Sequence, residues 1–218
     1  MFGEFSNPWS GVMMCSRTRY SLYMILLLCS LAAYGSDQQL PRLAGDAVIL
    51  AYGDSLTYGT GTTQEKSYPA ILQQLSGRHV VSVAIPGEVT ADGLSRLPEA
   101  LNDYSPALLV LCMGGNDILR RMNPALTEHN LEKMVKISRE HGVPVLLLGV
   151  PLPAFTTLKT APFYYDLAER LQVPLEADIL PEVLSDKALK SDQIHPNAEG
   201  YRLIAEAVYQ MLKKNGAL

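Results

Sequence analysis

The chain has 218 residues, of which 48% are hydrophobic and 18% are charged, and its net charge is −4. This length suits one domain with a full-sized core, and the composition is that of a globular protein, neither disordered nor embedded in a membrane throughout. No stripe of lysine and arginine runs along any segment, which excludes nucleic acid as an expected partner.

The first 35 residues differ in kind from the rest. Arg17 and Arg19 precede an uncharged, largely apolar stretch at 20–34, and small residues follow at its end. A basic flank, an apolar stretch and a small-x-small exit are the plan of a secretory signal. Because the stretch is shorter than the ~20 residues that span a bilayer, we expect cleavage after Gly35 rather than an uncleaved anchor.

This pattern divides the chain into a signal peptide or N-terminal anchor at 1–35 and one folded domain at 36–218. It predicts a protein exported to the bacterial periplasm, or else anchored in the membrane through the uncleaved segment. Translation starts at the first residue, at Met13 or at Met14, and the sequence does not decide among them. Cys112 is the one cysteine left after cleavage, so we expect a buried thiol and no disulfide.

After residue 45, short apolar runs alternate with segments of helical periodicity. Continuous apolar runs of this length are typical of parallel strands covered on both faces. They occur at Ala47–Ala51, Val80–Ile85, Leu108–Met113 and Val145–Val150. Helices are predicted at 68–75, 94–104, 123–141 and 197–214. This order predicts a three-layer α/β/α sandwich around a doubly wound parallel sheet of about five strands.

Glycine-rich and polar clusters follow the predicted strands. In such a sheet, ligands bind outside the carboxyl ends of the strands. The clusters are Gly53-Asp54-Ser55-Leu56, Pro86-Gly87-Glu88, Gly114-Gly115-Asn116-Asp117 and, before the last helix, Asp192-Gln193-Ile194-His195. Each cluster alone fits a turn or a helix cap. Their gathering at one edge indicates a common site.

These residues suit acyl transfer by an activated serine. A serine hydroxyl needs a base to take its proton, and the base needs a third group to orient it. We assign these catalytic roles to Ser55, His195 and Asp192. The oxyanion would be bound by the amides of Ser55 and Gly87 and by the Asn116 side chain. This chemistry needs no cofactor, and the four histidines lack a metal-ligand spacing.

Taken together, the blocks resemble the SGNH (GDSL-type) hydrolase superfamily, and most closely its bacterial arylesterase, lysophospholipase and acyl-CoA thioesterase I group. The resemblance covers residues 46–212. It implies a flavodoxin-like fold, a Ser-His-Asp triad and an acyl-enzyme. Pro86 departs from the pattern, because a small residue such as serine usually precedes this glycine. A Gly-x-Ser-x-Gly elbow is missing, which disfavours an ordinary α/β-hydrolase.

The segment Pro151–Phe163 is predicted as a long irregular loop beside the site. Its Leu152, Phe155 and Phe163 would wall an apolar groove for the acyl chain, although these side chains equally fit the core. We therefore expect a small-molecule substrate, a short- to medium-chain acyl ester or thioester. The alternatives are a carbohydrate O-acetylesterase with the same triad, a catalytically silent binding module, and acyl transfer to an acceptor other than water. The oligomeric state stays open.

Overall fold

The computed structural model describes residues 1, 3, 40–153 and 157–218. The chain divides into an N-terminal segment, Met1–Asp37, and a compact body, Gln38–Leu218. The basic flank, apolar stretch and exit of the predicted signal lie outside the described residues, so the division at residue 35 stays a prediction. No helix of the described segments has both the length and the apolar character to cross a membrane.

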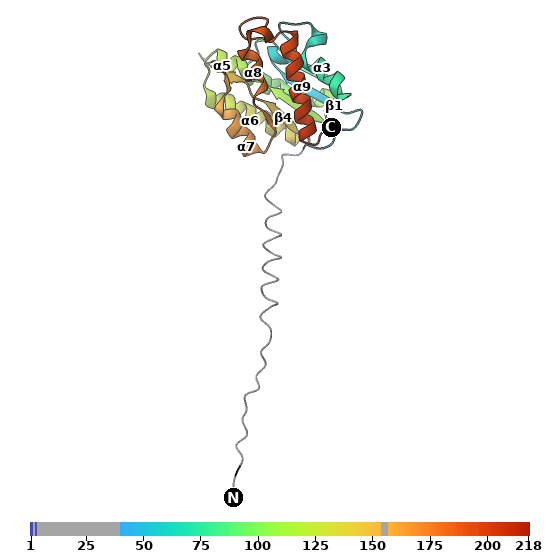
Figure 1. Cartoon of the computed structure of the whole chain (residues 1–218), viewed down its shortest axis with the longest axis vertical. Coiled ribbons are helices and arrows are strands. Elements are labelled where there is room, and N and C mark those ends of the chain that lie inside the picture. Colours follow the sequence, from blue (N-terminus) through green and yellow to red (C-terminus); the bar gives the residue numbers. More distant parts are fainter. Residues whose placement is uncertain (2, 4–39, 154–156) are drawn as a thin grey trace. The chain divides into compact units, whose positions relative to one another are not determined.

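A five-stranded parallel sheet forms the centre of the body (Figure 1). Its strands are β1 (Val48–Gly53), β2 (His79–Ala84), β3 (Leu108–Cys112), β4 (Val145–Leu148) and β7 (Leu175–Glu176). They lie in the order β2-β1-β3-β4-β7, and every neighbouring pair is parallel. The predicted α/β sandwich is confirmed. Because the chain runs from β1 outward to β2 and then back across to β3, the strand order reverses at β1, which is where ligands bind in such sheets.

Helices cover both faces of the sheet. On one face α3 (Tyr68–Ser76) and α8 (Ile179–Ser185) each contact α9 (Ala198–Lys214), which Figure 1 shows running across the sheet. On the other, α6 (Pro124–Glu140) contacts both α4 (Thr90–Tyr104) and α7 (Pro162–Leu171). The short α2 (Ser55–Tyr58) and α5 (Gly115–Leu119) follow β1 and β3, and two single 3-10 turns lie at Gln64–Lys66 and Lys187–Leu189.

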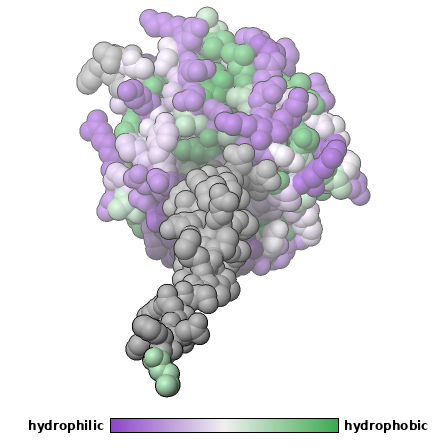
Figure 2. Space-filling model, turned by 60° about the horizontal axis from the view of Figure 1, so that its bottom comes forward, coloured by the Kyte–Doolittle hydropathy of each residue, from purple (hydrophilic) through white to green (hydrophobic). Residues whose placement is uncertain are grey.

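The core lies around the three inner strands. Nearly every residue of β1, β3 and β4 is buried, as their continuous apolar runs predict. The second run is different, because β2 is an edge strand and its residues are half-buried or exposed. Cys112 is buried at the end of β3, as expected, and burial raises the pKa of its thiol. Figure 2 shows hydrophilic residues spread over the face turned to the viewer, with smaller hydrophobic groups among them.

Three of the four predicted helices begin and end within one residue of the observed ones, whereas the helix predicted at 94–104 already begins at Thr90. The side chain of Asn123 accepts a hydrogen bond from the Ala125 amide at the start of α6, and Pro124 occupies the first turn. Asn197 caps α9 in the same way, by accepting from the amides of Glu199 and Gly200.

The predicted irregular loop after β4 is wrong in part. The chain forms a short antiparallel hairpin there, with β5 (Pro151–Leu152) paired to β6 (Lys159–Thr160). Phe163 already belongs to α7, because Pro162 opens that helix. Residues 154–156, including Phe155, lie outside the described residues.

Candidate active site

Ser55 lies at the turn from β1 into α2. The turn is tight: a side chain on Gly53 would place its Cβ 2.4 Å from the Cys112 carbonyl oxygen and 2.1 Å from the Thr57 hydroxyl. Asp54 caps α2, since its Oδ1 accepts a hydrogen bond from the Leu56 amide at 3.0 Å. Ser55 is thereby held as the first residue of the helix, at the carboxyl edge of the sheet.

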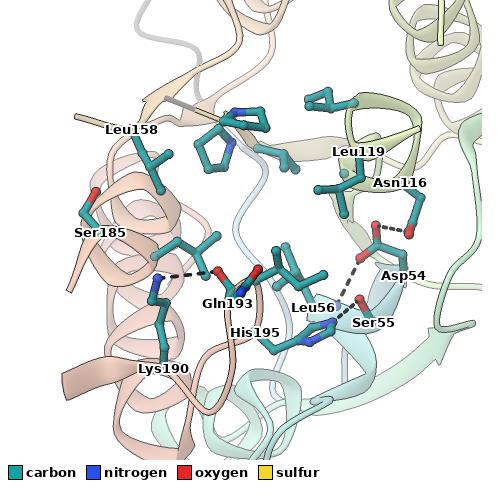
Figure 3. A pocket seen from close by; sticks show the side chains of 17 residues that line it. Asp54, Ser55, Leu56, Asn116, Leu119, Leu158, Ser185, Lys190, Gln193 and His195 are labelled. Atoms are coloured by element: carbon teal, nitrogen blue, oxygen red, sulfur yellow. Dashed lines mark hydrogen bonds between the residues drawn. The ribbon is translucent and has the colours of Figure 1, made fainter. Parts of the chain in front are cut away.

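His195 and Asp192 approach Ser55 from the loop before α9. The His195 Nε2 lies 3.0 Å from the Ser55 Oγ, and the His195 Nδ1 lies 2.8 Å from the Asp192 Oδ2 (Figure 3 shows the contact between Ser55 and His195). A proton on Nδ1 donated to Asp192 leaves Nε2 as an acceptor for the serine proton. The three residues that the sequence analysis assigned to the triad are thus brought within hydrogen-bond distance.

The carboxylate of Asp192 is held by its own loop. Its Oδ1 accepts hydrogen bonds from the amides of Ile194 and His195, at 2.8 and 2.9 Å. Burial raises the pKa of Asp192, but the hydrogen bonds from the His195 ring and from these two amides outweigh burial, and the pKa ends below its usual value. The group therefore stays ionised at neutral pH.

The base of this loop is anchored to α9. Asn197, the cap of α9, donates from its side-chain Nδ2 to the Ala188 carbonyl at 2.8 Å. Its backbone N–H donates to the Leu189 carbonyl, also at 2.8 Å. Further along α9, the Tyr201 hydroxyl donates to the carbonyl of Thr60 at 2.8 Å. The same hydroxyl lies 3.5 Å from the Ser55 carbonyl. The last helix therefore contacts the turn that carries Ser55.

The three predicted oxyanion donors follow β1, β2 and β3. No acceptor in the described part of the chain is bonded to the amides of Ser55 or Gly87. Gly87 has a φ of +81°, a conformation that favours glycine. The Asn116 Nδ2 is already engaged, since it donates to the Asp54 Oδ2 at 3.0 Å and to the Glu88 carbonyl at 2.9 Å. To reach an oxyanion, it must give up or share one of these bonds.

An ion pair that the sequence analysis missed fixes the loop of Gly87. Glu88 is buried and accepts from Arg96 of α4, with the Arg96 Nε 2.6 Å from the Glu88 Oε1. The Arg96 guanidinium also donates to the Gly53 carbonyl at 3.2 Å and lies 4.1 Å from the centre of the Tyr52 ring. It therefore joins α4, the loop after β2 and the end of β1. No sequence pattern marks this pair, because its members belong to different elements.

The aspartate that follows Asn116 has a structural role. Asp117 is buried, and its carboxylate accepts hydrogen bonds from the amide and the hydroxyl of Thr90, at 2.9 and 2.5 Å. Asn130 of α6 donates to the same hydroxyl at 3.0 Å. Asp117 thus links α5, the helix that also carries Asn116, to the start of α4.

A cavity of about 500 Å³ opens beside Ser55 and His195 (Figure 3). Most of its wall is apolar, and the apolar lining residues are Leu56, Ile118, Leu119, Val150, Pro151, Pro153, Leu158, Leu184 and Ile194. Asp54 and Asn116 line one side, whereas Ser185, Lys190 and Gln193 line the side across from them. Gly87 is not among the lining residues.

The acyl-groove residues predicted from the sequence do not line this cavity. Leu152 is 40% exposed, since successive side chains of the β5–β6 hairpin alternate and Pro151 is the one that faces the cavity. Phe163 packs against the core and stacks on Tyr164, with ring centres 4.6 Å apart. Two of the actual wall residues, Ile118 and Ile194, stand beside or inside the motifs themselves, which is the signal that could have identified them.

Residues 51–203 match the GDSL-like lipase/acylhydrolase family. The chain belongs to this family. It is therefore a hydrolase of the GDSL/SGNH esterase type. The matched range includes Ser55, Asp192 and His195, the three predicted catalytic residues.

Similar proteins match most of this chain. It is 31% identical to the arylesterase of Vibrio mimicus over 89% of this chain and 98% of that protein. It is also 31% identical to the thioesterase 1/protease 1/lysophospholipase L1 of Escherichia coli, over 79% of this chain and 86% of that protein. Among solved structures, a crystal structure of TesA superimposes with a TM-score of 0.70 at 33% identity, and covers 77% of this chain and 99% of its own.

Asp54 of the GDSL block is buried next to Ser55. Burial raises its pKa from 3.8 to about 6, although the Leu56 amide, the charge of His195 and the Asn116 side chain each oppose the rise. The folded protein therefore keeps a proton on Asp54 at a pH where the unfolded chain has lost it. The free energy of unfolding that this group contributes accordingly falls as the pH rises from about 4 to about 6.

Replacing Asp54 with asparagine should remove this pH dependence. The stability of the wild type relative to Asp54→Asn should decrease by about 3 kcal/mol between about pH 4 and pH 7. Urea unfolding of both proteins across this range measures the difference. Asp103→Asn, on the exposed surface of α4, is the matched control. A constant difference between wild type and Asp54→Asn would contradict the assignment.

Proposed function

We propose that this chain is a serine esterase and thioesterase that hydrolyses short- to medium-chain acyl esters and thioesters through an acyl-enzyme on Ser55. The observation that carries the proposal is the continuous line of hydrogen bonds from Asp192 through His195 to Ser55, beside an apolar cavity. The predicted signal segment at 1–35 supports an enzyme that works outside the cytoplasm, with the periplasm as the proposed compartment.

In the first half of the reaction, the His195 Nε2 takes the proton of Ser55 while the Oγ attacks the acyl carbonyl carbon. The charge on the carbonyl oxygen is met by the amides of Ser55 and Gly87, and by one hydrogen of the Asn116 side chain. Asp192 stabilises the imidazolium that forms. The imidazolium then donates its proton to the leaving oxygen or sulfur as the carbonyl–oxygen or carbonyl–sulfur bond breaks.

In the second half, a water molecule takes the place of the leaving group. His195 removes a proton from the water, whose oxygen attacks the acyl-enzyme, and the proton returns to the Ser55 Oγ as the acid is released. The overall reaction consumes one water molecule and releases the acid and the alcohol or thiol, and Ser55 and His195 return to their starting states.

The cavity supports an acyl chain longer than acetyl. Its volume lies within the usual range of small-molecule sites, and the lining around Ile118, Leu119 and Pro151 offers apolar contacts to a hydrocarbon chain. The names of the relatives, an arylesterase and a thioesterase/lysophospholipase, agree with esters and thioesters as the substrate class.

A chain-length series tests this proposal. The p-nitrophenyl esters from acetate to dodecanoate, and the matching acyl-CoA thioesters, should show higher kcat/KM for butyrate to octanoate than for acetate. A fluorophosphonate probe should label Ser55 in the same preparation, with heat-denatured protein as the control. A steep fall beyond acetyl would instead favour a carbohydrate O-acetylesterase, and an unlabelled protein would favour a silent binding module.

A further inference from the structure

The cavity beside Ser55 has a lysine, Lys190, in its wall. Apart from the catalytic His195, the charged residues that line it are Asp54 and Lys190. Figure 3 shows Lys190 across the cavity from Asp54 and Asn116, on the same side as Ser185. The cavity is therefore polarised, with the Asn116 amide, one of the proposed oxyanion donors, at one side and an ammonium group at the other.

The ammonium of Lys190 is held at the cavity without a carboxylate partner. Its Nζ lies 3.5 Å from the Gln193 carbonyl oxygen, at the long limit of a hydrogen bond. It forms no ion pair with any carboxylate among residues 40–153 and 157–218, whereas Arg96, Lys136, Arg170 and Arg202 all do. Asp192 lines a neighbouring depression with Lys190, but its oxygens are occupied by His195 and two amides.

The backbone of Lys190 is fixed to the catalytic loop. Lys190 pairs with Pro196 in an isolated β-bridge, and these two residues close the base of the loop that carries Asp192 and His195. The Asn197 side chain reaches the Lys190 carbonyl at 3.4 Å. The position of Lys190 relative to His195 is therefore set by the fold, while its side chain keeps the freedom to follow a ligand.

The proposed reaction determines which half of the substrate meets Lys190. The leaving atom must lie near the His195 Nε2 to receive its proton, so the leaving half runs along the side of the cavity formed by the loop of His195. Gln193 and Lys190 belong to that side. The acyl half is left with the apolar wall of Ile118, Val150 and Pro151.

We propose that Lys190 makes this enzyme selective for acyl esters whose leaving alcohol or phenol carries an anionic group, such as a carboxylate. The inference rests on the proposed function and names the chemistry of the leaving half. Lys190 acts as a specificity-determining residue that binds the anion and takes no part in proton transfer.

A matched pair of substrates tests the role of Lys190. One is p-nitrophenyl butyrate, and the other is the same ester with a carboxylate on the ring beside the nitro group. The readout is the ratio of kcat/KM for the anionic ester to that for the neutral ester. In Lys190→Met this ratio should fall on the order of 5- to 10-fold, mainly through KM, and in Lys190→Glu it should fall further. High salt should reduce the ratio for the wild type.

Lys187→Met is the control variant, because Lys187 is a nearby lysine that does not line the cavity. Its ratio should equal that of the wild type. An unchanged ratio in Lys190→Met overturns the proposal, and so does an equal loss for both esters, which would mean that Lys190 only supports the Gln193 carbonyl. A second pair, p-nitrophenyl hexanoate and p-nitrophenyl mono-adipate, places the anion on the acyl half. Dependence on Lys190 for this pair alone also overturns the proposal.

Binding separates this inference from the proposed function. If the wild type hydrolyses neither ester, the proposed function fails. The dissociation constant of the carboxylated nitrophenol, measured by calorimetry on the protein with and without Lys190→Met, then still reports the anion site. Weaker binding in the variant supports the site, and equal binding overturns it.

Discussion

Replacing Ser55 with alanine should lower kcat/KM for p-nitrophenyl butyrate by at least about 10⁴-fold while the fold stays intact. The proposed base, His195, lies 3.0 Å from the Ser55 Oγ, and the acyl-enzyme of the proposed reaction cannot form without this hydroxyl. Among the described residues the hydroxyl makes this one side-chain hydrogen bond, so its removal should change the free energy of unfolding by about 1 kcal/mol or less. Steady-state kinetics, circular dichroism and urea unfolding measure the two effects.

Ser95→Ala is the matched control for this experiment. Ser95 is exposed on α4, where its hydroxyl bonds the Ala91 carbonyl of the same helix, and it lies in no contact with the cavity. The control should keep wild-type turnover and fluorophosphonate labelling. Turnover near the wild-type level in Ser55→Ala would remove the basis of the proposed triad, whatever its effect on stability.

Replacing Asn116 with alanine should lower kcat on the order of 10²- to 10³-fold, with a smaller change in KM. The Asn116 amide is the predicted side-chain donor to the oxyanion, and that charge develops only in the transition state. The same substitution removes a donor from Asp54 and from the Glu88 carbonyl. A loss of about 1–3 kcal/mol in stability should therefore accompany the loss of rate.

Asn130→Ala separates these two effects. Asn130 is a buried amide, whereas Asn116 is half-buried, and Asn130 donates to Thr90 without lining the cavity. Its replacement should destabilise the protein comparably but reduce kcat by much less. If both variants lose the same rate, the effect of Asn116 is structural and its role as an oxyanion donor is refuted.

Much of the fold follows from patterns that are local in the sequence. The runs around Leu50, Leu109 and Leu146 are continuous because these strands are buried on both faces, and such runs can be recognised without a structure. The edge strand β7 has two residues, Leu175 and Glu176, too few to form a pattern, and the sequence analysis did not locate it. The β5–β6 hairpin was likewise missed, because proline is abundant there and each strand is only two residues long.

The candidate site likewise has a part that the sequence predicts and a part that it does not. Asp192 and His195 are three residues apart, so their contact is nearly determined by one turn of chain, and the motif predicts it. The cavity wall depends on which side chains of a hairpin and of two short helices face inward, which explains why Leu152 was chosen instead of Pro151. Glu88 and Arg96 meet only because α4 folds back over the end of β1, and no local pattern carries that information.

The contact between α9 and the Ser55 turn affects when the site can form during synthesis and folding. Ser55 is made 140 residues before His195, and the helix whose Tyr201 reaches the Ser55 and Thr60 carbonyls comes later still. A nascent chain, or one still unfolded, carries the serine without its proposed base. Recovery of esterase activity after dilution from denaturant should therefore not precede the docking of α9.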